Sequence, residues 1–434
     1  MLKKYLKSES LRNVSTLVSG TVLAQIIPIL LTPILSRIYT PQDFGFYGFY
    51  LSIISVFAVV ASGRFHLALF IANRSSKAVY ILKTSILVVL IFSSLISVGI
   101  IISSIFISRF SFWYYFVGLV VFNATLIEVL NTYANTKGDY KIMSSNMIIR
   151  SIIANFIFII LGVLKFGEDG LMIGLLLGQI LQLIHFYFYY QKEIRFYKIN
   201  SRLFRTTVYT YKNFLIHSSS SALLNNLSIQ LPTFFLKNYY NIASVGQYFQ
   251  SYKLLTLPNS FVAKAFGSVF VKKAADRLNK KEEINDIVLS LYKNLVFISF
   301  IPFSILAVYG DIIFSVILGE QWAESGVFAQ IISPWVYINF IVLPFTYLFE
   351  VFQRQKHFSI FNLILLTTRL VSLLVGYYYK DIYLSILLFS ISSFIVYSSM
   401  LIYLFNLTKV KGLTNYFLYI IFFIITTLVL YLLK

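Results

Sequence analysis

Four charged residues stand inside long stretches that are otherwise apolar, and they are the first candidates for chemistry in this sequence. They are Glu128, Arg150, Lys253 and Arg369. An unpaired charge in hydrocarbon costs about 2.5–3.5 kcal/mol even on lenient insertion scales, so a charge kept there indicates a function or a specific partner. The three cations have the chemistry to bind phosphate oxygens, and the single carboxylate is the candidate for coupling to an ion gradient.

Three of these residues also have a local interpretation. Arg150 and Glu128 lie on successive predicted helices and could pair with each other, whereas Lys253 could extend its ammonium group to the membrane surface. Lys253 and Arg369 have no obvious acidic neighbour in the sequence, which favours a cavity lined by cations. A rise of about 1.5 Å per residue places the three cations roughly 13–19 Å from the ends of their helices, near mid-depth.

The sequence offers few parts for catalysis. It has no cysteine, its four histidines are scattered, and neither a phosphate-binding Gly-Lys-Ser/Thr loop nor a paired-carboxylate site occurs. Thiolate chemistry is therefore excluded, and nucleotide-driven pumping and metal catalysis have no recognisable motif. We predict no catalytic residue, no metal site and no cofactor, and we expect a protein that is not an enzyme.

Composition explains the long apolar stretches. The chain is 58% hydrophobic and only 12% charged, about half the charge of a soluble domain, which indicates a multi-pass membrane protein. Segments of roughly 20 apolar residues predict spans at 14–35, 44–62, 86–107, 112–133, 148–164, 171–190, 214–236, 244–263, 294–309, 327–349, 358–379 and 382–405, with a further apolar run at 415–433.

The chain has a net charge of +20, and its basic residues are distributed as this topology requires. Basic residues concentrate in alternate loops, beginning with the N-terminal segment, and the positive-inside rule therefore places the N-terminus in the cytoplasm. The partners that this charge predicts are anionic membrane lipids and not nucleic acid.

The turn between the first two predicted spans recurs in the second half of the chain. Tyr39, Gly45 and Tyr47 reappear in the same order and spacing as Tyr240, Gly246 and Tyr248. Six spans per half is an even number, so the two halves run in the same direction and form parallel repeats. The fold we predict is all-α, with six-helix lobes at 1–200 and 201–410 and an extra hydrophobic segment at 411–434.

Polar residues recur at helical spacing on the first helix of each lobe. They are Thr21, Gln25, Pro28, Thr32 and Ser36, then His217, Ser221, Asn225 and Ser228. Each set lies on one face, which favours a hydrated path with Gln25 and Asn225 as substrate contacts; contacts between helices are the alternative. Arg37 and Arg64 are weaker candidates, because an ion pair with Asp43 and the basic bias of the inner loops also explain them.

The first seventy residues resemble the opening of Wzx-type polysaccharide flippases of the multidrug/oligosaccharidyl-lipid/polysaccharide (MOP) exporter superfamily. The matching parts are Ser19-Gly20, Gln25, Pro33, Leu35-Ser36-Arg37, Tyr39-Thr40-Pro41, Asp43-Phe44-Gly45 with Tyr47, and Gly63-Arg64. The resemblance implies two MATE-like lobes around a cationic cavity that flip undecaprenyl-diphosphate-linked oligosaccharides, such as O-antigen or capsule repeat units, across the bacterial inner membrane by alternating access. It also implies a polysaccharide polymerase and a chain-length regulator as partners. The family has twelve spans, so the run 415–433 would be a thirteenth.

Two alternatives stay open. A drug or cation antiporter of the same superfamily should present buried acids to its substrate, whereas the predicted spans here hold one acid and three cations. A membrane oligosaccharide polymerase usually needs a large outer loop, and the longest predicted outer segment, about 310–326, is small. We therefore expect Arg150, Lys253 and Arg369 to hold the diphosphate, with Arg37, Arg64, Gln25 and Asn225 as further contacts and Glu128 as the coupling residue.

Overall fold

The computed structural model describes residues 20, 22–72, 75–106, 111–196, 201–212, 214–259, 264–410, 423 and 425. Within these ranges the elements are helices joined by short turns, and no β-strand occurs among them. This confirms the predicted all-α fold. The N-terminal basic segment, Thr21 and most of the run 415–433 lie outside the described residues.

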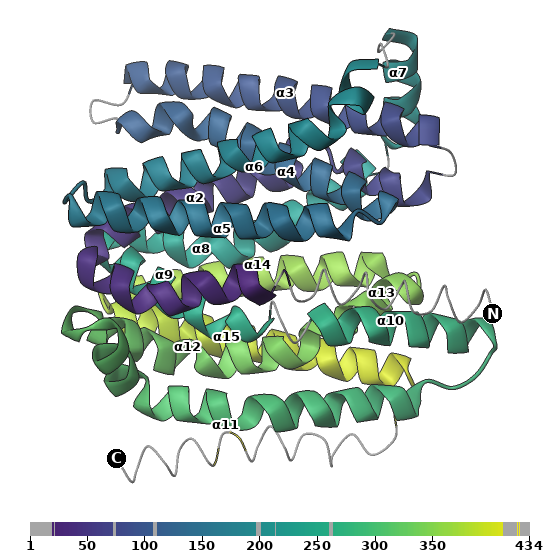
Figure 1. Cartoon of the computed structure of the whole chain (residues 1–434). Helices are drawn as coiled ribbons and strands as arrows, with labels where there is room; N and C mark the ends of the chain where they lie inside the picture. Colours follow the sequence, from purple (N-terminus) through teal and green to yellow (C-terminus); the bar gives the residue numbers. More distant parts are fainter. Residues whose placement is uncertain are drawn as a thin grey trace. The chain divides into compact units, whose positions relative to one another are not determined.

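The first compact unit covers Met1–Asn226. After a short apolar helix, Val22–Ile38, its helices are α2 (Pro41–Ala61), α3 (Ser75–Phe106), α4 (Val117–Lys137), α5 (Tyr140–Val163), α6 (Glu168–Phe196) and α7 (Ser201–Thr210), with the 3-10 helices η1 (Phe65–Ile71) and η2 (Phe112–Phe116) before α3 and α4. α4 contacts α2, α3, α5 and α6, and in Figure 1 it lies among them. It therefore forms the centre of this unit.

The second compact unit covers Leu227–Lys434, so the division between the two compact units falls inside α8. Its helices are α8 (Ser219–Tyr239), α9 (Ile242–Leu255), α10 (Lys264–Asn279), α11 (Asn285–Leu318), α12 (Ala323–Val342), α13 (Leu348–Val351), α14 (Gln355–Tyr378) and α15 (Ile382–Leu407). The short helices η3 (Phe214–Ser218), η5 (Glu320–Trp322) and η6 (Leu343–Tyr347) precede α8, α12 and α13. α12 packs against α9, α11 and α15 and is the central helix of this unit.

Nine helices among the described residues are long and apolar enough to cross a membrane, which supports a multi-pass membrane protein. Three predicted spans differ from them. The described part of the first predicted span forms the helix Val22–Ile38, and most of the span's residues before it lie outside the described residues. The span predicted at 214–236 becomes α8, whose serines and asparagines lower its hydropathy, and α9 has only 14 residues. At about 1.5 Å per residue α9 itself covers roughly 21 Å, and residues 260–263 of this predicted span lie outside the described residues.

The repeated turn begins a helix in each unit in the same way. Thr40 is the N-cap of α2 and forms a capping box with Asp43, whose carboxylate accepts hydrogen bonds from the Thr40 backbone N–H and hydroxyl, both at 2.8 Å. Asn241 is the N-cap of α9 and accepts from the Ser244 N–H at 2.8 Å. The predicted ion pair between Arg37 and Asp43 is therefore wrong: the carboxylate satisfies the orphan amide at the start of α2 instead.

The tyrosine before each cap packs against the last hairpin of its unit. The Tyr39 hydroxyl donates to the Phe158 carbonyl of α5 at 2.7 Å. The Tyr240 hydroxyl lies 2.9 Å from the Ser385 Oγ of α15, and its ring meets that of Tyr377 on α14 edge-on. The recurring sequence is thus a recurring structural element, which ties the first turn of each lobe to the α5–α6 or α14–α15 hairpin.

A glycine at a corresponding place in each hairpin permits this close packing. A Cβ built on Gly162 would overlap Ile38, and one built on Gly376 would overlap the Ser385 backbone. Small residues of this kind let helix backbones approach in membranes.

We expect Gly376→Ala to destabilise the second unit by about 1–3 kcal/mol, because the Ser385 backbone cannot move away as a flexible side chain could. Gly99→Ala is the matched control, since a Cβ there meets no atom within 4 Å. The measurement is thermal unfolding of the purified protein in detergent. Equal melting temperatures for the two variants would contradict the close packing described for α14 and α15.

Candidate functional site

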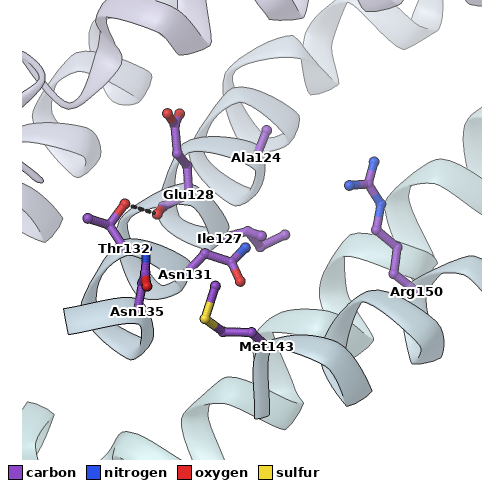
Figure 2. Close-up of a pocket in the computed structure, with 8 residues that line it drawn as sticks. All are labelled: Ala124, Ile127, Glu128, Asn131, Thr132, Asn135, Met143 and Arg150. Atoms are coloured by element: carbon purple, nitrogen blue, oxygen red, sulfur yellow. Dashed lines mark hydrogen bonds between the residues drawn. The ribbon is translucent and has the colours of Figure 1, made fainter. Parts of the chain in front are cut away.

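A pocket of about 350 Å³ lies between α4 and α5 in the first unit (Figure 2). The residues that line it are Ala124, Ile127, Glu128, Asn131, Thr132, Asn135, Met143 and Arg150. The four polar residues from α4 recur at three- and four-residue steps, so they share one face of that helix. The pocket therefore combines one carboxylate, two carboxamides, a hydroxyl and a guanidinium group, which together can donate and accept hydrogen bonds.

Arg150 supplies the positive charge of this pocket. Its side chain is exposed on α5, and Figure 2 shows it on a different helix from Glu128 and Asn131. Pairing with Glu128, the local interpretation of the sequence, is not formed: the Glu128 Oε1 lies 3.4 Å from the His66 Nε2 instead. The guanidinium group is thus placed to meet a ligand that enters the pocket.

Glu128 ends a short chain of polar groups that begins in η1. His66 is 2% exposed, and its Nδ1 lies 2.8 Å from the Ser62 Oγ. Its Nε2 faces Glu128, whose side chain is 52% exposed. The buried imidazole therefore bridges a hydroxyl and a partly exposed carboxylate.

A tight turn before η1 positions this histidine. Gly63 and Arg64 both adopt left-handed backbone conformations, with φ of 55° and 53°, and the Arg64 N–H donates to the Ser62 Oγ at 3.2 Å. A non-glycine residue in this conformation is uncommon and is held by its surroundings. Sequence reasoning missed His66, because it weighed this histidine only as a possible metal ligand; the Gly63-Arg64 pair and the four-residue spacing from Ser62 were the available signals.

The weaker candidates do not line this pocket. Arg64 is partly buried beside η1, Arg37 is exposed near the end of the helix Val22–Ile38, and Gln25 is partly buried on that same helix. Asn225 is partly buried on α8. The pocket thus brings together Glu128 and Arg150 among the predicted site residues.

Three residues of the polar stripes form hydrogen bonds within the protein. The buried Thr32 donates to the Pro28 carbonyl at 2.6 Å, and the buried Ser36 donates to the Pro33 carbonyl at 3.0 Å. Such bonds to the preceding helical turn satisfy a hydroxyl without water. On α8, the stripe residue Ser228 bonds to Arg369, as described next.

Arg369 is buried in the second unit, with 0% of its surface exposed. Its Nε donates to the Ser393 Oγ at 2.8 Å, and its Nη1 donates to the Ser228 Oγ at 2.9 Å and carbonyl at 3.1 Å. Its Cζ lies 5.0 Å from the Trp335 ring centroid and 4.8 Å from that of Phe389. Ring faces and hydroxyls replace the hydration of the guanidinium group.

This burial corrects the prediction that Arg369 faces an open cavity. The side chain joins α14 to α8 and α15 by hydrogen bonds and to α12 by contact with Trp335. Lys253, the other predicted cation of the second unit, is partly buried in the last turn of α9.

Comparisons with known proteins agree with this architecture. A model of the family described as "polysaccharide biosynthesis protein" matches residues 34–327. The lipid II flippase MurJ in an inward closed conformation is similar in structure, with a TM-score of 0.72 and 14% identity over 96% of this chain and 92% of that chain. No curated protein matches the sequence.

Two further solved structures are similar. An inward-facing multidrug resistance MATE family transporter of the MOP superfamily has a TM-score of 0.68 and 14% identity, over 89% of this chain and 96% of that chain. A MOP superfamily transporter from Pyrococcus furiosus has a TM-score of 0.64 and 13% identity, over 92% and 94%. At these identities the likeness shows the fold, which is the two-lobe fold of MOP transporters.

From the contacts of Arg369 we predict that removing its side chain destabilises the protein. We expect Arg369→Ala to lower the free energy of unfolding by roughly 2–5 kcal/mol, because it leaves a cavity among the rings and two serines without their partner. Arg369→Lys should recover only part of this, since an ammonium group lacks the planar fork. Arg354→Ala, at an exposed arginine of the same unit, is the control in thermal unfolding. An Arg369→Ala protein as stable as the control would refute a structural role.

Proposed function

The chain belongs to the polysaccharide biosynthesis protein family, and on that premise we propose that it flips undecaprenyl-diphosphate-linked oligosaccharide repeat units across the bacterial inner membrane. The two-lobe fold of MOP transporters supports transport by alternating access, in which the lobes rock about the substrate. The product would be a surface polysaccharide such as O-antigen or capsule. A polysaccharide polymerase and a chain-length regulator would act on the flipped units, and the N-terminus would face the cytoplasm.

The pocket between α4 and α5 is the observation that carries this proposal. A diphosphate is an anion that cannot cross hydrocarbon bare, and the exposed guanidinium group of Arg150 can bind two phosphate oxygens at once. Asn131, Thr132 and Asn135 line the same pocket and can exchange hydrogen bonds with sugar hydroxyls. One cation and several neutral polar groups would hold the headgroup without trapping it.

The other predicted residues have three different roles in this proposal: a second cation, secondary contacts and a positioning residue. Lys253 contributes a second cation from α9, where its ammonium group meets the diphosphate during transport. Gln25, Arg37, Arg64 and Asn225 remain proposed secondary contacts. Arg369 acts as a positioning residue that holds α8, α14 and α15 together, since its Nε and Nη1 already donate to serines and the group is buried.

Arg150 gives the direct test. In a strain that lacks the gene, we expect loss of surface polysaccharide and accumulation of lipid-linked repeat units, both restored by the wild-type chain. Arg150→Ala should restore export at least tenfold less well, and Arg150→Lys should be intermediate because it keeps the charge without the fork. Lys141→Ala removes one charge from an exposed residue of the same helix and should restore export fully. Full export by Arg150→Ala, at equal amounts in the membrane, would exclude Arg150 as the phosphate ligand.

We also propose that Glu128 couples transport to the proton gradient through His66. Protonation of this pair adds one positive charge beside the pocket, and that charge favours binding of an anionic headgroup. Proton and substrate would therefore strengthen the binding of each other, as linkage requires.

In proteoliposomes, an imposed pH gradient should accelerate flipping by the wild-type protein and by Glu350→Gln, a variant of an exposed acid in the second unit. Glu128→Gln and His66→Gln should keep slow basal flipping and lose the acceleration. The coupling proposal fails if Glu128→Gln responds to the gradient as the wild type does.

A further inference from the structure

α7 has two different faces. On the inner side, Val208 packs against the hydrophobic core cluster of the first unit, which includes the buried Tyr211 just beyond the helix. The Lys77 Nζ, near the start of α3, lies 5.8 Å from the Tyr211 ring centroid. In Figure 1 α7 runs across the direction of α3 and α6. It is therefore held crosswise at the level where the spanning helix α3 begins.

One exposed side of α7 and of the two residues that follow it carries basic and aromatic groups, while Leu203 is exposed elsewhere on the helix. Arg202, Arg205, Tyr209 and Lys212 recur at steps of three and four residues, so they share one face, and all four are exposed. The Lys212 Nζ lies 4.4 Å from the Tyr209 ring centroid, and Tyr209 is 72% exposed. The sequence contains no acidic residue between Glu193 and Asp276, so no acid from this stretch neutralises the face.

We propose that this face, called here the α7 basic face and made of Arg202, Arg205, Tyr209 and Lys212, binds the anionic headgroups of membrane lipids. Three observations support lipid as the partner. The helix lies across the spans, as a helix in the plane of the interface does. Its charges are all positive, which complements anionic phosphate headgroups. Its aromatic residue is a tyrosine, which is enriched where membrane meets water.

The absence of cysteine from the chain allows a single reporter on this face. Thr206 is exposed on α7, and Thr206→Cys can carry an environment-sensitive fluorophore in the full-length protein. We expect a blue shift in vesicles of phosphatidylcholine mixed with phosphatidylglycerol, relative to phosphatidylcholine alone. Headgroup-labelled nitroxide lipid should quench the fluorophore more strongly in the anionic vesicles, and high salt should abolish the difference.

The triple variant Arg202→Gln, Arg205→Gln and Lys212→Gln should lose this dependence on anionic lipid. Lys273→Gln, Lys280→Gln and Lys281→Gln remove the same charge from exposed positions of the second unit and should keep it. Thermal unfolding of both variants verifies that they remain folded. The proposal is overturned if the reporter responds equally in both kinds of vesicle, if the α7 variant still responds, or if the control loses the response to the same extent. This test is independent of what the protein transports.

Discussion

An ionised side chain inside a membrane protein must find in the protein the solvation that hydrocarbon does not supply, and this constraint shapes both units. Arg369 meets it inside the protein, where two of its three nitrogens donate to serines on two helices and aromatic rings surround the guanidinium group. Arg150 meets it by exposure to a polar pocket. The two arginines therefore represent opposite solutions, a cation used to hold helices together and a cation that remains available for a ligand.

Asp43 and Glu128, two acidic residues of the first unit, show the same contrast between a structural contact and an open position. Asp43 accepts the orphan amide at the start of α2 and so has a purely structural partner. Glu128 pairs with a histidine and is half exposed, and it lines the same pocket as Arg150. One carboxylate of the unit is thus used up by a helix start, and the other keeps a side open to the pocket.

The apolar stretches and the recurring turn predicted most of the fold, because the length of a helix and the residues that cap it depend on neighbouring residues in the sequence. The tyrosines at 39 and 240 carried the two-lobe prediction for the same reason. The partners of the charged residues could not be predicted in this way. Arg369 meets rings from α12 and α15, and Glu128 meets His66 only because the Gly63-Arg64 turn reverses the chain. These contacts between side chains of different helices depend on how each helix is rotated about its axis. The spacing of residues along the sequence does not determine that rotation.

The contacts of Arg369 and Gly376 have a mechanical consequence. Hydrogen bonds to Ser228 and Ser393 join α14 to α8 and α15, and the glycine brings the α14 and α15 backbones into direct contact. These three helix segments therefore form a block that resists bending, since a packed core deforms in steps and not continuously. Pro232 removes one backbone donor of α8 one turn beyond Ser228. The contacts of Tyr239 and Tyr240 with Tyr377 and Ser385 nevertheless keep the far end of α8 against the same block, so the block holds α8 on both sides of its proline.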